Sequence, residues 1–200
     1  VFTDLGFSGL IVRLGEGFKK IDVQSPKVFA GAAAHLTAII TRTMEAGLSG
    51  AEKLAGIPGT LGGAIFQNSG ARDYDVSHAI GSVTFWDWTA RQIRTLPKNE
   101  LGFGYRTSIF HNIRAVILSA ELDMRPAKRE ELMAEVSQRM KYRNETQPTG
   151  RSVGCIFKNP QGKSAGQLVD ESGLKGRRVG GLAISDIHGN FFLNDGRATF

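Results

Sequence analysis

Apolar and polar residues alternate in several segments of the first part of the chain, which is the pattern of half-buried β-strands. Lys20–Ser25 alternates with a period of two, and the β-rich run Gly9–Leu14 before it also predicts a strand. Gly81–Leu96 predicts a hairpin of two strands, and Ala115–Leu122 has the continuous apolar character of a buried strand. These segments are the predicted strands of a sheet.

Three further segments predict helices. The first begins near His35 and ends before Gly47, where a glycine favours the C-terminus of a helix. The second follows Pro126, which fits a first helical turn, and the third covers Ser164–Glu171 before Gly173. The apolar positions are Leu36, Ile39, Ile40 and Met44 in the first helix and Leu132, Val136 and Met140 in the second.

The composition of the chain changes at Arg125-Pro126, where a highly charged stretch begins that ends at Arg143. This change predicts a domain boundary, with one domain over residues 1–124 and a second over residues 125–200. Short strand-like runs at Ile184 and Phe191–Leu193 alternate with the third helix. Together these elements predict an α+β fold.

Composition narrows the class of protein. Hydrophobic residues make up 41% and charged residues 22% of the chain, which is typical of a soluble globular protein. A single cysteine, Cys155, excludes an internal disulfide framework and a multi-cysteine zinc site, and the scattered histidines predict no metal site. No apolar run approaches the ~20 residues of a spanning helix, so we expect a cytoplasmic protein without membrane insertion.

The net charge of +6 favours an anionic partner, which could be a nucleic acid, a membrane surface or a phosphorylated small molecule. One segment could meet such a partner, because glycines expose backbone N–H groups without an obstructing Cβ. It contains Gly56, Gly59, Gly62 and Gly63 around Pro58. It matches neither the dinucleotide fingerprint nor the P-loop, so the residues alone leave open a pyrophosphate cradle or a tight turn between packed elements.

The glycine segment and several others resemble one known family in collinear order. Ala55–Ala71, AGIPGTLGGAIFQNSGA, resembles the signature of the UDP-N-acetylenolpyruvoylglucosamine reductase (MurB) family. Further similar segments are Gly47–Glu52, Gly104–Phe110, Gly154–Pro160, Ala165–Val169, Gly173–Gly176, Ser185–Phe191 and Ala198-Thr199. The family is a group of flavoenzymes of peptidoglycan precursor synthesis, so the resemblance implies an enzyme.

The resemblance implies an FAD-binding domain of the vanillyl-alcohol-oxidase (PCMH) flavoprotein type over residues 1–124. A small α/β substrate-binding domain would follow over residues 125–200. In the family the glycine signature lies against the FAD. The implied cofactor contacts are Gly56, Ile57, Gly59, Thr60, Gly62, Gly63, Asn68 and Ala71.

The implied reaction passes a hydride from NADPH to FAD and then to the enolpyruvyl group of a UDP-linked amino sugar. Arg106 would stabilise the enolate that forms, because a guanidinium binds a carboxylate at two points. Cys155 stands where most relatives have a serine that protonates the enolate carbon, and a thiol is the stronger acid. Without the family, Arg106 would be a surface arginine on aromatic rings and Cys155 a small buried hydrophobe.

The resemblance also implies substrate contacts from the segments after Cys155. The implied residues are Lys158, Asn159, Ser185 and Asn190. Lys158 fits a polar turn closed by Pro160 equally well. The charged run ending at Arg143 is interpreted as a solvated helix face, although Arg143 precedes a Gln147-Pro148 pair that the family carries near its substrate site.

Two features of the family are not in this sequence: a glycine turn that would precede Val1 and a glutamate that would follow Phe200. We therefore expect an internal segment of such a reductase, which is inactive alone. Two alternatives remain: another FAD-dependent oxidoreductase of the same fold, and a basic nucleic-acid-binding domain. The polyanionic substrates explain the charge without nucleic acid, so we expect a small-molecule partner and no nucleic acid. The oligomeric state is left open.

Overall fold

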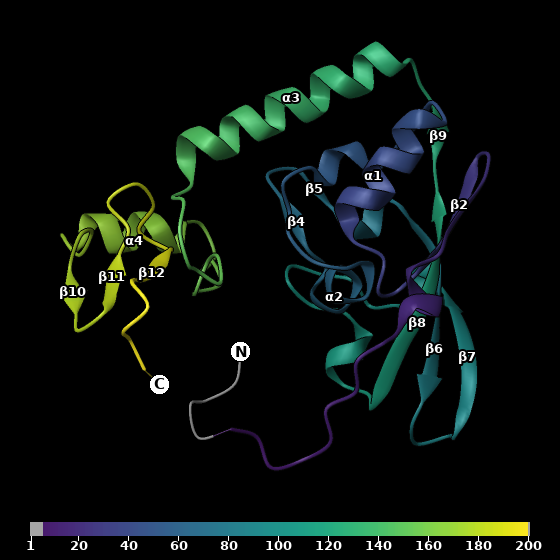
Figure 1. Ribbon diagram of the computed structural model, residues 1–200, viewed down its shortest axis with the longest axis horizontal. Coiled ribbons are helices and arrows are strands. Elements are labelled where there is room, and N and C mark those ends of the chain that lie inside the picture. The colour runs from purple at the N-terminus through teal and green to yellow at the C-terminus, as the bar shows by residue number, and fades with distance from the viewer. Residues whose placement is uncertain (1–5, 200) are drawn as a thin grey trace. The chain divides into compact units, whose positions relative to one another are not determined.

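The structure is a computed structural model that describes residues 6–199 (Figure 1). The chain forms two compact units: one covers residues 12–140, and the other takes Lys141 onward together with the described residues before Val12. The division therefore falls within helix α3 (Arg129–Thr146), whereas the sequence places it between residues 124 and 125. The physical reason is that the charged stretch begins with residues that still pack on the first unit.

The start of that stretch differs from the prediction. Pro126 does not lie in a helical turn but in strand β9 (Arg125–Pro126), which pairs with β3 (Leu48–Ser49). In α3, Leu132 is buried and Val136 packs against the core of the first unit. The helix is therefore confirmed but begins at Arg129, and the stripe is confirmed at Leu132 and Val136, whereas Met140 is 39% exposed.

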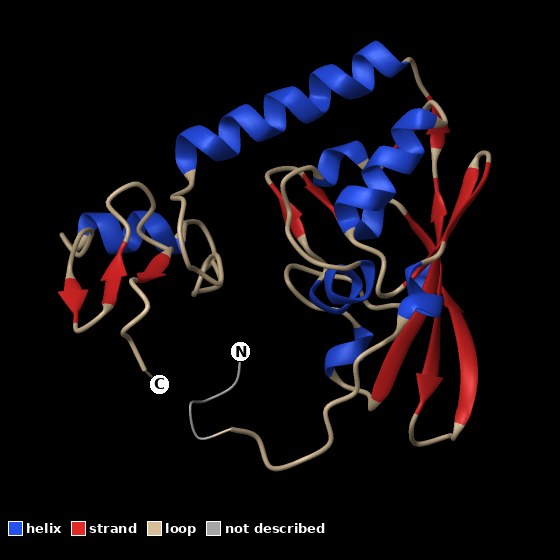
Figure 2. Cartoon of the chain, viewed as in Figure 1, coloured by secondary structure: helices blue, strands red, loops and turns tan. Residues whose placement is uncertain are grey.

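The first unit is built on a five-stranded antiparallel sheet with the order β1-β2-β8-β6-β7 (Figure 2). The strands are β1 (Ile21–Gln24), β2 (Lys27–Gly31), β6 (Ile80–Asp87), β7 (Gln92–Pro97) and β8 (Ala115–Asp123). The predicted hairpin and buried strand are confirmed as β6–β7 and β8. The strand predicted over Gly9–Leu14 is wrong, because that segment pairs with no strand among the described residues and exposes Leu10 and Ile11.

Helices α1 (Leu36–Glu45) and α2 (Leu61–Gln67) cover one side of this sheet (Figure 1). Alternate strand residues such as Val28, Val83 and Phe85 point into the core beneath them. The predicted first helix is confirmed, and Gly47 after it has a φ of +66°. The unit is completed by β4 (Gly70–Ala71), β5 (Tyr74–Asp75) and short 3-10 turns at Glu16–Lys19, Glu52–Leu54, Val76–His78, Lys98–Glu100 and Ile109–His111.

The second unit contains a three-stranded antiparallel sheet and one short helix. The strands are β10 (Arg178–Val179), β11 (Leu182–Ile184) and β12 (Phe192–Asn194), and the helix is α4 (Ala165–Glu171). The predicted third helix is confirmed, because Ser164 caps it through Gln167 and Gly173 follows with a φ of +65°. The strand-like runs at Ile184 and Phe191–Leu193 are confirmed as well. Among the described residues, no helix is long and apolar enough to cross a membrane.

Candidate functional site

The glycine segment forms a loop that leads into α2 and is tied to the strand-to-helix connection before α1. Backbone N–H groups of Leu61 and Gly62 donate to the carbonyls of Ala34 and Ala32 at 2.9 and 2.8 Å. In return, the Leu36 N–H donates to the Gly59 carbonyl at 3.1 Å. Thr60 is the N-cap of α2, so the loop and the helix start are held as one rigid piece.

The glycines of this segment face two different environments. A Cβ on Gly62 would lie 2.9 Å from the Ala32 Cβ, so this glycine permits close packing inside the unit. Gly63 is exposed, and a Cβ there would meet only the Thr60 Oγ1 at 3.7 Å. Gly59 has a φ of +119° and open space where a Cβ would be. One side of the segment therefore packs and the other is open.

The open side presents backbone donors. Ile57 donates its N–H to the Leu54 carbonyl. In the described part of the chain, no protein acceptor takes the N–H groups of Gly56, Gly59 and Thr60, and both glycines are exposed. Backbone donors next to a helix start attract anions, so the loop fits a phosphate or pyrophosphate group.

Arg106 lies in a tight turn near the other end of α2. Gly104 and Thr107 exchange two backbone hydrogen bonds, which leaves Arg106 at the corner with a φ of +53°. Its Nη1 donates to the Asn68 carbonyl at 3.1 Å, and its Nη2 donates to the Gly70 carbonyl. The guanidinium also lies 5.2 Å from the centre of the Tyr105 ring. The Arg106 guanidinium therefore lies over the Tyr105 ring, and the two carbonyl contacts fix its orientation.

Asn68 is the C-cap of α2 and is 2% exposed. Its Nδ2 donates to the Gly104 carbonyl at 2.9 Å, and its Oδ1 accepts from the Ser77 N–H at 3.2 Å. In this structure its side chain therefore holds other loops of the unit. Ala71 follows in β4, directly after the Gly70 carbonyl that binds Arg106.

The second unit holds the other candidate residues. Cys155 is exposed and its segment pairs with the segment at Phe191. The buried side chain of Asn190 fixes this segment, because it accepts from the Phe157 N–H at 2.8 Å and donates to the Phe157 carbonyl at 2.9 Å. Lys158 and Asn159 follow and are exposed, with the Asn159 Oδ1 accepting from the Ala165 N–H at 3.0 Å.

Ser185 is buried like Asn190. Its Oγ accepts from the N–H groups of Ile187 and His188 at 3.1 and 3.2 Å. Burial lowers the pKa of His188, whose Nδ1 accepts the Asn190 N–H. Asn190 thus holds the segment that follows Cys155, and Ser185 holds the turn at Ile187 and His188. Cys155, Lys158 and Asn159 are exposed.

The sequence did not predict that Arg143 lies close to Cys155. Burial lowers the pKa of the Arg143 guanidinium, and the nearby Cys155 charge opposes this shift. Arg143 is half-buried, so it does not belong to the solvated helix face expected for this run. The only indication in the sequence was the Gln147-Pro148 pair after Arg143, which the family carries near its substrate site.

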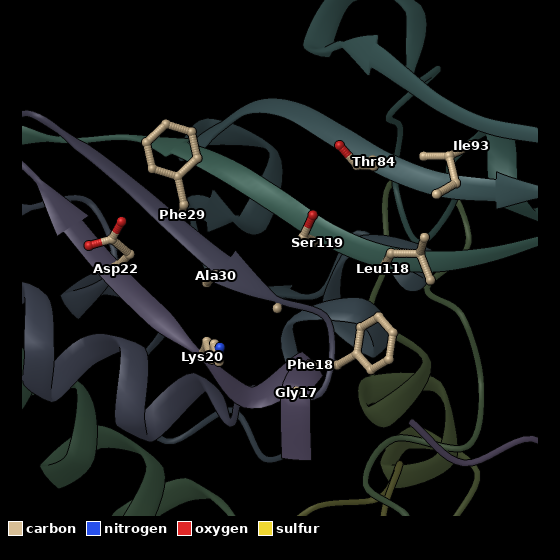
Figure 3. Close-up of a pocket in the computed structure, with 11 residues that line it drawn as sticks. Gly17, Phe18, Lys20, Asp22, Phe29, Ala30, Thr84, Ile93, Leu118 and Ser119 are labelled. Atoms are coloured by element: carbon tan, nitrogen blue, oxygen red, sulfur yellow. The ribbon is translucent and has the colours of Figure 1, made fainter. Parts of the chain in front are cut away.

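A shallow hollow on the five-stranded sheet is unrelated to these residues (Figure 3). Its lining includes Phe18, Phe29, Thr84, Ile93 and Ser119 from the sheet and the turn before it. None of the sequence-predicted site residues lines it. The candidate residues instead form two groups, the glycine segment with Arg106 in one unit and the Cys155 segment in the other.

Comparisons with known proteins point to one family. A family model described as the C-terminal domain of UDP-N-acetylenolpyruvoylglucosamine reductase matches residues 145–200. A curated Bacillus licheniformis protein of that name is 38% identical over 200 residues, which is 98% of this chain and 65% of that protein. A Bacillus thuringiensis protein named UDP-N-acetylenolpyruvoylglucosamine reductase 1 is 37% identical, over 98% of this chain and 66% of that protein. The chain thus spans just under two thirds of these relatives.

A solved structure agrees with the sequence relatives. The crystal structure of the reductase (MurB) from Thermus caldophilus matches with a TM-score of 0.89 and 36% identity. The match covers 98% of this chain and 71% of that one. The resemblance predicted from the motifs is confirmed, and the chain belongs to the UDP-N-acetylenolpyruvoylglucosamine reductase (MurB) family.

Proposed function

We propose that this chain is the part of a reductase that carries out the NADPH-dependent reduction of UDP-N-acetylglucosamine enolpyruvate. The product is UDP-N-acetylmuramate, a peptidoglycan precursor. One observation carries the proposal: α2 has the open glycine loop at its start and the carbonyl-bound Arg106 near its end. A helix of seven residues is about 10 Å long. The backbone donors that fit a phosphate and the guanidinium that fits a carboxylate are therefore close enough to contact one bound cofactor and its substrate.

The cofactor of this proposal is FAD in a fold of the vanillyl-alcohol-oxidase type. The N–H groups of Gly56, Gly59 and Thr60 fit its pyrophosphate, since they are backbone donors without a protein acceptor in the described chain. Gly63 adds open space along the helix, where a backbone can approach a ligand closely. Bound FAD would accept a hydride from NADPH and deliver it to the enolpyruvyl double bond.

Arg106 has the role of binding the substrate carboxylate. Hydride addition to the double bond leaves an enolate conjugated with that carboxylate, and a fixed cation lowers the energy of this charge. The two carbonyl contacts of Arg106 fix the plane of the guanidinium before substrate arrives. Such preorganisation avoids a reorientation cost during the reaction.

Cys155 has the role of the proton donor. The S–H bond breaks as a C–H bond forms at the enolate carbon, which leaves a thiolate that water reprotonates. The half-buried Arg143 favours that thiolate by its charge. Lys158 and Asn159 contact the UDP-linked substrate, and the buried Asn190 holds the segment just before them. The buried Ser185 holds the turn at Ile187 and His188.

The visible absorption spectrum of the flavin tests this proposal in the full-length enzyme. NADPH without oxygen should bleach the flavin band, and the enolpyruvyl sugar nucleotide should restore it while forming one product molecule per flavin. A protein without a flavin band, or a bleached flavin that the substrate does not reoxidise, would contradict the proposal.

A further inference from the structure

Three of the four described non-glycine residues with positive φ lie in one region of the first unit. They are Asn68, Arg72 and Arg106, with φ values of 44°, 60° and 53°. L-residues rarely adopt this left-handed conformation, and it persists where the surrounding structure enforces it. The region around Arg106 is therefore held in an unusual backbone conformation by specific contacts.

Asn68 makes the contacts that connect this region. Its backbone carbonyl accepts from the Arg106 Nη1 at 3.1 Å, and its side-chain Nδ2 donates to the carbonyl of Gly104 at 2.9 Å. Gly104 is the residue that closes the turn around Arg106. The buried Asn68 thus binds both the Arg106 guanidinium and Gly104, the first residue of the turn that carries Arg106.

Asparagine suits this position for two physical reasons. It tolerates the left-handed conformation better than most residues, and its amide is both a donor and an acceptor. The acceptor is used as well, because Oδ1 receives the Ser77 N–H at 3.2 Å. With 2% of the residue exposed, the side chain is directed into the protein.

We propose that Asn68 is a positioning residue, which acts on the reduction of the enolpyruvyl group through Arg106. The inference rests on the proposed function, in which Arg106 binds the substrate carboxylate. It assigns to Asn68 an effect on the substrate half-reaction and none on flavin reduction by NADPH. If Asn68 instead contacted the flavin, its substitution would slow flavin reduction by NADPH and spare the substrate half-reaction.

The first test is Asn68→Gly in the flavin-loaded, full-length enzyme. Glycine keeps the left-handed conformation and the carbonyl toward Arg106, while the amide that holds Gly104 is lost. We expect flavin reoxidation by the enolpyruvyl substrate to slow by about 10- to 100-fold in rapid mixing, with flavin reduction unchanged. Asn68→Asp keeps the acceptor for Ser77 and loses the donor to Gly104, so it should be slowed similarly.

Thr43→Val is the matched control for lost stability. Thr43 is fully buried in α1, and its hydroxyl donates to the Ile39 and Ile40 carbonyls at 3.0 Å. The variant should lower the melting temperature and leave both half-reactions unchanged. An equal slowing in Asn68→Gly and Thr43→Val would reduce Asn68 to a structural residue and overturn the proposal.

The double variant tests whether the effect passes through Arg106. In an Arg106→Ala background, Asn68→Gly should slow reoxidation by no more than about twofold further, because the residue it positions is absent. The full single-variant loss in that background would overturn the proposal. If Arg106→Ala itself leaves reoxidation unchanged, the proposed function of Arg106 fails instead.

A chemical measurement without flavin turnover separates these failures. Phenylglyoxal modifies guanidinium groups, and peptide mass spectrometry gives the modification rate at Arg106 alone. Asn68→Gly should raise that rate, and Thr43→Val should not. An unchanged rate at Arg106 would show that Asn68 does not hold it, whatever the enzyme assays give.

Discussion

Asn68 in the first unit and Asn190 in the second perform the same task in different surroundings. Each is 2% exposed, and each holds a segment that carries a proposed reaction residue. Asn190 binds the Phe157 backbone with both atoms of its amide, whereas Asn68 binds Gly104 through Nδ2 and Ser77 through Oδ1. Asn68 lies in a unit with a large core that includes Leu61, Ile65 and Phe85. In the described residues of the second unit, the buried apolar side chains are Ala165 and Phe191.

The difference indicates how each of the two groups of candidate residues keeps its shape. A large apolar core stabilises the first unit independently of any single hydrogen bond. The second unit buries little apolar surface, so the Asn190 contacts carry a larger share of its local stability. We therefore expect that losing one buried hydrogen bond changes the stability of the second unit more than that of the first.

The largest expected effect concerns the exposed residue of the second unit. Cys155→Ala should slow flavin reoxidation by substrate by ~10²–10⁴-fold and leave reduction by NADPH unchanged, because it removes a general acid. Cys155→Ser should retain substantial turnover. Rapid-mixing absorbance traces measure both steps, and an unchanged second step in the alanine variant would remove Cys155 from the mechanism.

The next effect concerns Arg106, the half-buried cation of the first unit. Arg106→Ala should slow the same step by ~10²–10³-fold, as for the loss of a fixed charge stabiliser. Arg106→Lys keeps the charge without the planar fork and should recover only part of the rate. Full activity of the lysine variant would show that the orientation set by the Asn68 and Gly70 carbonyls is irrelevant.

A pair of asparagines in the second unit tests the contrast between buried and exposed residues. Asn190→Ala should lower the free energy of unfolding by about 1–3 kcal/mol, because two hydrogen bonds to Phe157 are lost. Asn159→Ala removes an exposed side chain and should instead raise the substrate KM. Thermal melts and steady-state kinetics of both variants would contradict the contrast if their effects were reversed.

In the first unit, Gly62→Ala is expected to act on packing alone. The added Cβ would lie 2.9 Å from the Ala32 Cβ and 3.1 Å from its carbonyl oxygen. Overpacking of this kind costs about 1–3 kcal/mol, which denaturant unfolding would measure. A variant of unchanged stability would mean that α2 moves away from the sheet more easily than its hydrogen bonds suggest.

Local patterns predicted most elements, and the failures have a common physical origin. The Gly9–Leu14 run has the composition of a strand but pairs with no strand in residues 6–199. Pro126 pairs with Leu48, which lies far away in the sequence. Both depend on tertiary contacts that spacing does not reveal. The hydrogen bonds of Asn68 to Gly104 and of Asn190 to Phe157 likewise join segments far apart in the sequence, so spacing could not reveal them.

The exposed and buried sides of the glycine segment differ most clearly at Gly63. A Cβ there would meet only the Thr60 Oγ1 at 3.7 Å, so Gly63→Ala should leave the apoprotein as stable as before or slightly more stable. The proposed flavin site needs a close backbone approach on this face, which the methyl group would block. Gly62→Ala provides the matched variant on the packed face.

The flavin dissociation constant of Gly63→Ala, measured by fluorescence titration of the apoprotein, tests the central claim that this face binds the cofactor. We predict at least about tenfold weaker binding, equivalent to ~1.4 kcal/mol, at an unchanged or higher melting temperature. An unchanged dissociation constant would contradict the claim and leave the glycine segment as a packing turn.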